Sequence, residues 1–279
     1  MEATDTILRH YQSPDLLSRI EEGLGKMGKS PSTVVADDLG PVDEFHTRGA
    51  AATAELIALL NAGPATHLLD VGSGLGGPAR RLAAATGCRV TGIDLSADYC
   101  AVGTELTKWL GLTEQVKLTQ GDGAQAVDTA AGPYDAAWTI HVGMNVRDKP
   151  AFYAGIAKAL KPGASFVIYD VLSNGGGDFH FPLPWAKTPE SSFVATLDEM
   201  KGHLAGAGFE LLQVSNQTAE SLAFFDEIAA RSQKLGAPPP LGLHLVLGPD
   251  LSKMIPNLRK NLAEGRAQVG AILCRKAAL

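Results

Sequence analysis

Cysteine is scarce in this sequence, and the common metal-binding patterns are missing. The 279 residues include three widely spaced cysteines, Cys88, Cys100 and Cys274. An odd number without a CxxC pair excludes a disulfide framework, so we expect free, buried thiols in a reducing compartment. The histidines are scattered and no HExxH sequence occurs. The sequence therefore also predicts that no metal ion is bound.

Clustered positive charge and long apolar runs are missing too. Lysine and arginine number 24 against 30 aspartates and glutamates, which gives a formal net charge of −6. Nucleic-acid binding requires clustered positive side chains, and the first five residues do not resemble a signal peptide. No apolar run approaches membrane-spanning length. We therefore expect a cytoplasmic protein, a monomer or homodimer, with a small-molecule substrate and no nucleic-acid or membrane partner.

What the sequence contains instead is a regular alternation of short apolar runs and helical stretches. Strands are predicted over residues 67–71, 89–93, 116–119, 136–140, 165–169, 209–214 and 268–274. Helices are predicted over residues 49–61, 78–86, 97–110, 150–160 and 197–207. Such alternation is typical of βαβ units and of a parallel sheet covered by helices on both faces. The predicted fold class is therefore α/β.

The segments outside this core have a different character. Near the start, Thr4 or Asp5 is a candidate cap for a short helix, and Ser13-Pro14-Asp15 is a candidate start for a second one. The stretch from 30 to 48 is mixed, with Gly40-Pro41 as a predicted break. We expect a single domain over 1–279. It consists of an N-terminal helical lid (1–48) and a core cofactor-binding sheet (49–215), followed by a helical insertion that serves as a substrate cap (216–266) and a closing strand (267–279).

A glycine-rich loop, Gly72-Ser73-Gly74-Leu75-Gly76-Gly77, lies between the first predicted strand and the following helix. Glycine lets the backbone take positive φ angles and approach a ligand closely. The free N–H groups at the start of the helix favour an anionic group. The loop therefore predicts a ligand site at the carboxyl end of a parallel strand. Its spacing also matches the dinucleotide fingerprint, so by itself it fits a nicotinamide cofactor, another nucleoside cofactor or a tight turn without a ligand.

Acidic residues at the ends of the first three predicted strands narrow these possibilities. Asp70 precedes the loop and would repel a pyrophosphate, which disfavours a dinucleotide. Asp94 ends the second strand, where a carboxylate either accepts hydrogen bonds from both ribose hydroxyls or caps the next helix. Asp122 either accepts a hydrogen bond from an adenine amino group or lies in a simple turn.

Taken in order, these segments resemble class I S-adenosylmethionine-dependent methyltransferases. The matching segments are HLLDVGSGLGG at 67–77, GIDLS at 92–96, GDG at 121–123, YDAAW at 134–138 and LKPGA at 160–164. Ala164 replaces a glycine that is usual in the family, and a small residue still fits that turn. Outer segments are similar to the branch that contains sarcosine/dimethylglycine, tocopherol and quinone methyltransferases, namely DEFHTRG at 43–49, HVGMN at 141–145 and FPLPWA at 181–186.

The resemblance implies a Rossmann-like sheet of seven strands with the last one antiparallel, and S-adenosylmethionine as the cofactor. It implies that the glycine loop contacts the methionine end of the cofactor, that Asp94 holds the ribose, and that Leu95 lies against the adenine. The expected cofactor-binding residues are Asp70, Gly72, Ser73, Gly74, Gly76, Asp94, Leu95, Asp122, Gly123 and Ala124.

The expected reaction is transfer of a methyl group to a small-molecule acceptor, either an amine nitrogen or an aromatic or phenolic oxygen or carbon, by in-line displacement. His141, at the end of the fourth predicted strand, is the candidate general base and fits equally well as part of the cleft wall. His46 either orients substrate or forms a local hydrogen bond. The aromatic faces of Phe181 and Trp185 suit an ammonium group or an apolar ring of the substrate. The expected substrate-binding residues are His46, Met144, Asn145, Phe181 and Trp185.

Two alternatives remain open on the sequence. One is an NAD(P)-dependent oxidoreductase that uses the same glycine loop, and Asp70 and the later segments argue against it. The other is a catalytically inactive S-adenosylmethionine-binding protein. The set of Gly72, Asp94 and Asp122 indicates cofactor binding but does not bear on turnover.

Overall fold

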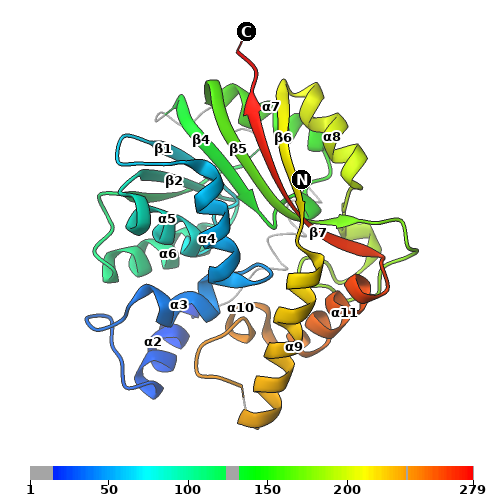
Figure 1. Cartoon of the computed structure of the whole chain (residues 1–279). Helices are drawn as coiled ribbons and strands as arrows, with labels where there is room; N and C mark the ends of the chain where they lie inside the picture. Colours follow the sequence, from blue (N-terminus) through cyan, green and yellow to red (C-terminus); the bar gives the residue numbers. More distant parts are fainter. Residues whose placement is uncertain (1–14, 124–131, 237, 279) are drawn as a thin grey trace.

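The chain folds around a seven-stranded mixed sheet (Figure 1), and the computed structural model describes residues 15–123, 132–236 and 238–278. The strand order is β3-β2-β1-β4-β5-β7-β6. The strands are β1 (His67–Val71), β2 (Arg89–Asp94), β3 (Val116–Gln120), β4 (Tyr134–Ile140), β5 (Leu160–Ser173), β6 (Phe209–Asn216) and β7 (Ala267–Lys276). Strand β7 pairs antiparallel with both β5 and β6, whereas the pairs among β1 to β5 are parallel. This arrangement confirms the predicted Rossmann-like sheet with an antiparallel last strand.

Helices connect the parallel strands and cover the sheet, as the alternating sequence pattern predicts. The core helices are α4 (Gly49–Leu60), α5 (Gly77–Thr86), α6 (Ala97–Trp109), α7 (Lys149–Ala159) and α8 (Leu197–Gly206). The segment between β6 and β7 contains α9 (Thr218–Leu235), α10 (His244–Leu247) and α11 (Leu251–Ala263), and the N-terminal segment contains α2 (Leu16–Lys26) and α3 (Ala36–Asp43). Within the described ranges, no helix is both long and apolar enough to cross a membrane.

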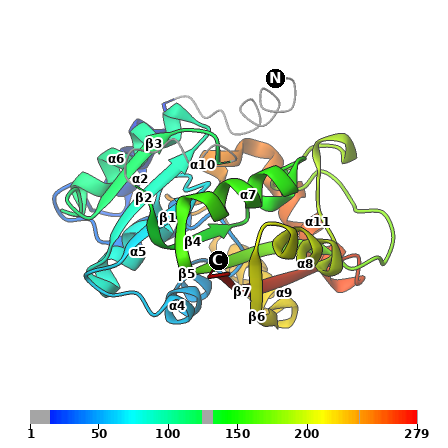
Figure 2. The same ribbon diagram turned by 90° about the horizontal axis from the view of Figure 1, so that it is seen from above.

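The two faces of the sheet bury separate apolar clusters, because successive side chains of a strand point to opposite faces. Leu68 of β1 belongs to a cluster that includes residues of α4, α5, α9 and α11, whereas its neighbour Leu69 belongs to a cluster with residues of α7 and α8. Seen from above, α7 lies on one side of the sheet and α4 and α9 lie on the other (Figure 2). Both faces are therefore covered, which leaves the carboxyl ends of the parallel strands as the place for a ligand.

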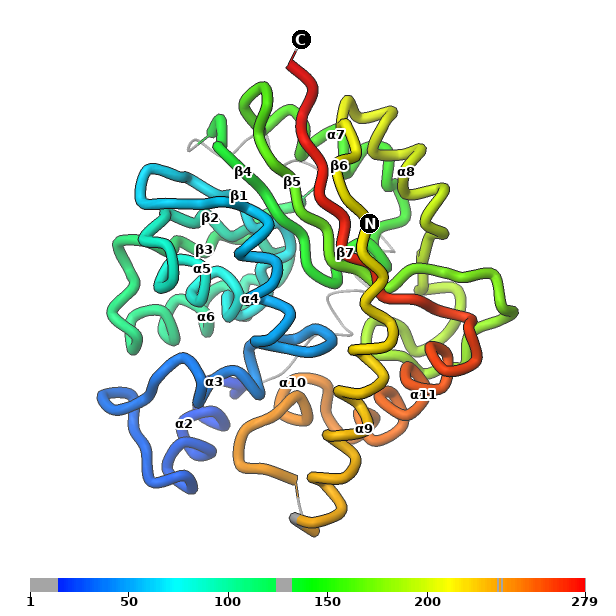
Figure 3. The backbone as a smooth tube through the Cα atoms, viewed as in Figure 1, coloured from blue at the N-terminus to red at the C-terminus, as the bar shows by residue number. Residues whose placement is uncertain are grey.

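A third apolar cluster joins the N-terminal helices to the segment between β6 and β7. Ile20 and Leu39, from α2 and α3, are fully buried in it together with Leu241 and Val246. The tube in Figure 3 shows α2 and α3, in blue, near α10, in orange, and α2 contacts α10 directly. Leu75 of the glycine loop belongs to the same cluster, so these two distant segments meet beside the predicted ligand loop.

The structure corrects several predicted boundaries. The mixed stretch from 30 to 48 contains helix α3, which continues through Gly40-Pro41. The side chain of Asp38 accepts a hydrogen bond from the backbone N–H of Val35 at 2.9 Å and caps the helix, and packing against α5 outweighs the proline. Strand β5 runs over 14 residues instead of the five predicted, because it pairs with β4 on one side and along the length of β7 on the other. The helix predicted near Thr4 or Asp5 lies outside the described residues.

Candidate active site

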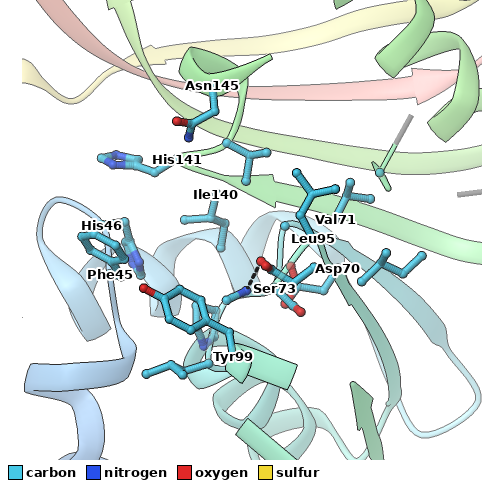
Figure 4. Close-up of a pocket in the computed structure, with 18 of the residues that line it drawn as sticks. Phe45, His46, Asp70, Val71, Ser73, Leu95, Tyr99, Ile140, His141 and Asn145 are labelled. Carbon is cyan, nitrogen blue, oxygen red and sulfur yellow. Dashed lines mark hydrogen bonds between the residues drawn. The ribbon is translucent and has the colours of Figure 1, made fainter. Parts of the chain in front are cut away.

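A cavity lies at the carboxyl ends of β1, β2 and β4 and encloses about 1300 Å³ of empty space, including its open mouth. Its lining comes from the glycine loop, from the ends of these strands, from residues 42–46 and from the segments around residues 144, 185 and 246. Figure 4 shows labelled side chains from these parts facing one space. The volume is large enough for a nucleoside cofactor together with part of a substrate.

The glycine loop forms one end of the cavity. Gly72, Gly74 and Gly76 have φ angles of 78°, 53° and 77°, which favour glycine. A Cβ at Gly74 would meet no atom within 4 Å, so the backbone there borders open space. Gly76 lies outside the cavity lining, and its missing side chain makes room for Leu118 and Arg80 instead. Of the predicted loop residues, Asp70, Gly72, Ser73 and Gly74 line the cavity.

Asp94, at the end of β2, is held by the backbone of two loops. Its Oδ2 accepts a hydrogen bond from the N–H of Gly74 at 2.8 Å, and its Oδ1 accepts one from the N–H of Ser96 at 2.9 Å. The cap of α6 is Ser96, whose Oγ accepts from the N–H of Tyr99. Asp94 therefore fixes the glycine loop against the start of α6, and its carboxylate still lines the cavity.

Asp70 and Ser73 present buried polar atoms with unmet hydrogen-bonding capacity. Asp70 is 3% exposed, and burial raises the pKa of its carboxyl to about 7, with the negative charge of Asp94 adding to the rise. The nearby indole of Trp138 lowers that pKa, but among the described residues neither Asp70 Oδ2 nor Trp138 Nε1 makes a hydrogen bond of good geometry. The Oγ of Ser73 is buried without a partner in the same part of the chain. Such atoms are rare in folded proteins, and those of Asp70 and Ser73 lie on residues of the cavity lining, where a polar ligand group or water can bond to them.

The remaining cofactor predictions fall around the same end. Leu95, Asp122 and Gly123 line the cavity, and Ala124 lies outside the described residues. Two further lining residues, Phe45 and Tyr99, did not stand out in the sequence. In the sequence, Tyr99 has the pattern of an ordinary apolar residue of a helix, and it lines the cavity because it lies in the first turn of α6. The only sequence feature that pointed to this place was its position five residues after Asp94.

His141 lies directly after β4 and lines the opposite side of the cavity. Its φ angle is 55°, and its N–H donates to the carbonyl of Tyr169 at 2.7 Å. The imidazole stacks on the Tyr169 ring at a centroid distance of 5.3 Å, and its Nε2 lies 3.2 Å from the Oγ1 of Thr47. Burial moves the pKa of His141 well below its usual value of 6.5, and His46 lowers it further. The ring is therefore neutral at physiological pH.

His46 lines the cavity as well, with its ring centroid 6.0 Å from that of His141. Its Nε2 donates to the carbonyl of Gly49 at 3.1 Å, and the hydroxyl of Thr53 lies at the same distance. Burial lowers the pKa of His46 to about 4, so it is also neutral. The local bonding considered from the sequence is present, and the ring still faces the cavity.

Met144 and Asn145 lie on a short 3-10 turn, η2 (Gly143–Asn145), and both line the cavity. A backbone hydrogen bond holds the turn in place: the carbonyl of Met144 accepts a hydrogen bond from the N–H of Phe193 at 2.8 Å. The ammonium of buried Lys149 donates to the carbonyls of Val146 and Phe193. Burial raises the pKa of nearby Asp170 to about 7, although Lys149 opposes that rise.

The two aromatic residues predicted after β5 separate. Trp185 is buried and lines the cavity, with its indole N–H donating to the Oγ of Ser192 at 2.9 Å. Phe181 lies outside the lining and packs against Phe179 and the core below the sheet. Both residues contact the same apolar cluster, but only Trp185 lines the cavity, which sequence spacing alone did not distinguish.

Comparisons with known proteins agree with this geometry. A family profile described as a methyltransferase domain matches residues 68–163. An O-methyltransferase from Pyrenophora dematioidea is 26% identical over 76% of this chain and 77% of its own length. A 2-methyl-6-phytyl-1,4-hydroquinone methyltransferase from Synechocystis is 34% identical over 45% of this chain and 38% of its own length. Geranyl diphosphate C-methyltransferase from Streptomyces coelicolor, at 19% identity, superposes with a TM-score of 0.72 over 99% of both chains.

Residues 68–163 thus match a methyltransferase domain, and the sheet has the fold of solved methyltransferases. The chain is similar to O-, sterol and hydroquinone methyltransferases. It spans less than two-fifths of the length of the sterol and hydroquinone enzymes that it matches. An all-parallel dinucleotide-binding sheet has the order 3-2-1-4-5-6, so the antiparallel β7 between β5 and β6 also argues against the oxidoreductase alternative.

Proposed function

We propose that this enzyme methylates a hydroxylated aromatic small molecule of largely apolar character, with His141 as the general base. The observation that carries the proposal is the composition of the cavity beyond the glycine loop. That part is lined by His141, Met144, Trp185 and other neutral side chains. Among the described lining residues there is no lysine or arginine. A neutral acceptor with apolar surface fits such a wall better than an anionic one.

The residues at the other end fit S-adenosylmethionine. Asp94 would hold the ribose hydroxyls with the lone pairs that its backbone bonds leave free. Asp70 and Ser73, whose buried polar atoms lack partners, would meet the polar methionine portion, with the open space at Gly74 beside them. Leu95 would lie against the adenine, and Asp122 and Gly123, continuing to Ala124, would border its edge. When bound, the cofactor supplies a methyl group already activated on a sulfonium.

The protein's own contribution is alignment and proton removal. His141 and the glycine loop line the same cavity, so an acceptor placed near His141 would lie close to a cofactor at the loop, which favours in-line attack through proximity. A phenolic hydroxyl must lose its proton as it is methylated, and a neutral imidazole is ready to accept it. Asn145 would hold a second oxygen of the acceptor, while Trp185, Met144 and His46 would enclose its ring.

An anionic acceptor is disfavoured by charge. The carboxylate of Asp43 lines the cavity and is paired with Arg80, and the other described acidic lining residues lie at the cofactor end. A diphosphate would therefore meet no balancing lysine or arginine in the described lining. Among the sequence relatives are an O-methyltransferase and a hydroquinone methyltransferase, whereas the structural neighbour with the TM-score of 0.72 is a geranyl diphosphate methyltransferase. We further propose that residues 1–48 act as a lid and residues 216–266 as a substrate cap, because Val42, Phe45 and Val246 line the cavity.

The test is a substrate panel with release of S-adenosylhomocysteine as the readout. The panel contains phenols and hydroquinones, matched primary and secondary amines, and prenyl diphosphates. We expect turnover of hydroxylated aromatics, with methylation at the oxygen or at a ring carbon. Turnover confined to amines or diphosphates would overturn the acceptor assignment, and cofactor binding without turnover of any class would favour an inactive binding protein.

His141 is tested by the His141→Asn variant, because asparagine tolerates the positive φ angle at this position. Removing a general base is expected to lower kcat about 100-fold or more with little change in the Kd of S-adenosylmethionine. His203→Asn on α8, outside the cavity lining, is the matched control and should turn over at the rate of the unaltered enzyme. An unchanged kcat in His141→Asn would return His141 to the cleft wall.

A further inference from the structure

Two buried hydroxyl groups meet behind His141, from parts of the chain that are far apart in sequence. Thr47 follows α3 and is 3% exposed, and Tyr169 of β5 is 1% exposed. The Oγ1 of Thr47 lies 2.9 Å from the Oη of Tyr169 and 3.2 Å from the Nε2 of His141. The three side chains form a continuous hydrogen-bonded row next to the cavity.

One arrangement of the protons satisfies all three contacts at once. The hydroxyl of Tyr169 donates to the backbone carbonyl of Thr47 at 3.3 Å, because a carbonyl can only accept. The Oγ1 of Thr47 then donates its one proton to the Oη of Tyr169. Toward His141 the same Oγ1 acts as an acceptor, and Nε2 of His141 carries the proton of that bond.

The other ring nitrogen is left with its lone pair. Nδ1 of His141 makes no hydrogen bond among the described residues, and the residue lines the cavity. The stacking on Tyr169 and the backbone bond to the Tyr169 carbonyl hold the ring in this orientation.

We propose that Thr47 and Tyr169 are positioning residues that hold His141 in its Nε2–H tautomer, so that Nδ1 is the basic atom. The inference rests on the proposed role of His141 as the base. In the reaction the acceptor oxygen forms its bond to the methyl carbon while the sulfur–methyl bond breaks, and the proton of the acceptor hydroxyl moves to Nδ1. The resulting imidazolium keeps its Nε2–H bond to Thr47 and later releases the Nδ1 proton to water. Thr47 and Tyr169 exchange no proton with the substrate.

The tautomer can be measured without a substrate. In protein labelled with ¹⁵N-histidine, long-range proton–nitrogen correlation spectra distinguish Nε2–H from Nδ1–H, and His141→Asn identifies the signal. We expect Nε2–H in the unaltered protein. In Thr47→Val, and in Tyr169→Phe, which keeps the stacked ring, we expect a mixture of tautomers. An Nδ1–H tautomer in the unaltered protein, or an unchanged spectrum in both variants, would overturn the inference.

Kinetics on the best acceptor of the panel provides the second test. Thr47→Val is expected to lower kcat about tenfold or more, as befits loss of part of a general-base contribution, with KM little changed. Thr47→Ser, which restores the hydroxyl, should recover most of the rate. Thr139→Val removes another buried hydroxyl, one that donates to the Val71 carbonyl at 3.1 Å, and should leave kcat unchanged.

The two proposals fail in different ways. If His141→Asn keeps full turnover, the proposed base is wrong, whatever the tautomer. If His141→Asn loses turnover while Thr47→Val and Tyr169→Phe both match the unaltered enzyme, the base stands and the positioning role falls. A kcat of Thr47→Ser as low as that of Thr47→Val would also contradict the positioning role.

Discussion

The guanidinium of Arg80 and the carboxylate of Asp43 form an ion pair with an N–O distance of 2.6 Å, and both side chains are almost completely buried. The pair joins α5, which follows the glycine loop, to the end of α3. Arg80 also donates to the carbonyls of Leu75 and Gly103. A Cβ at Gly77 would lie 2.3 Å from the Asp43 carbonyl oxygen, so glycine permits this close contact. The described part of the N-terminal segment is thereby fastened to the glycine loop that lines the cavity.

Replacing Arg80 by methionine should destabilise the protein strongly. The change leaves the Asp43 carboxylate buried without its partner, and breaking a buried pair in this way costs about 3–5 kcal/mol. The free energy of unfolding, measured with denaturant, checks this expectation. Arg275→Met is the matched control, because its pair with Glu210 is about half exposed and such surface pairs contribute less than about 1 kcal/mol. Equal losses in the two variants would contradict the structural role of Arg80.

Asp94→Ala should weaken cofactor binding at least about tenfold, which corresponds to about 1.4 kcal/mol. The variant removes both the proposed ribose acceptor and the hydrogen bond that holds the N–H of Gly74. Calorimetric titration with S-adenosylmethionine and S-adenosylhomocysteine measures the loss. Asp98→Ala, an exposed residue in the first turn of α6, should bind as the unaltered protein does. An unchanged Kd for Asp94→Ala would exclude its ribose role.

Cofactor affinity should rise with pH around neutrality because of Asp70. Burial raises the pKa of this carboxyl to about 7, so the free protein is largely protonated there at pH 6 and largely ionised at pH 8. A cationic ligand favours the ionised form, so binding releases a proton and tightens by up to about tenfold over this range. Titrations in buffers of different ionisation enthalpy measure both effects. Asp70→Asn should remove the dependence, and Asp135→Asn should retain it.

The raised pKa of Asp70 makes folding stability depend on pH in the opposite direction to cofactor affinity. In the unfolded chain the Asp70 carboxyl ionises near its ordinary pKa of about 3.9, well below the value in the folded state. Folding therefore takes up a proton between these two pKa values. The stability that this group contributes is fully present below about pH 4 and is lost as the pH rises through about 7. Bound cofactor is expected to reduce that loss.

That the glycine loop, Asp94 and Asp122 line one cavity was predictable because the signals are local. A strand, a glycine loop and a helix follow one another directly, and Asp94 and Asp122 each come at or just after the end of a strand. The parallel strands then bring these residues to one edge without further information. Helix α3 was missed because Gly40-Pro41 is a break by local rules, whereas the contacts of Arg80 and Arg81 with Asp43 and Glu44 hold it from another helix.

The substrate end depends on contacts that no local pattern encodes. Thr47 lies 94 residues from His141 and 122 residues from Tyr169 in sequence, and nothing near Thr47 indicates that its hydroxyl faces a histidine. Trp185 and Phe181 share one short segment and both contact the same apolar cluster, yet only Trp185 lines the cavity. Which of the two side chains lines the cavity depends on the path of the loop between β5 and α8.

The position of β7 has a consequence for how the molecule is assembled during synthesis. Residues 267–276 lie between β5 and β6 and pair with both along most of their length. While the ribosome is still adding the helices of the preceding segment, β5 and β6 have no partner between them. The part of the sheet that contains β5, β7 and β6 is therefore completed only when β7 emerges from the ribosome. Until then the edges of β5 and β6 that will pair with β7 are open to pairing with other chains.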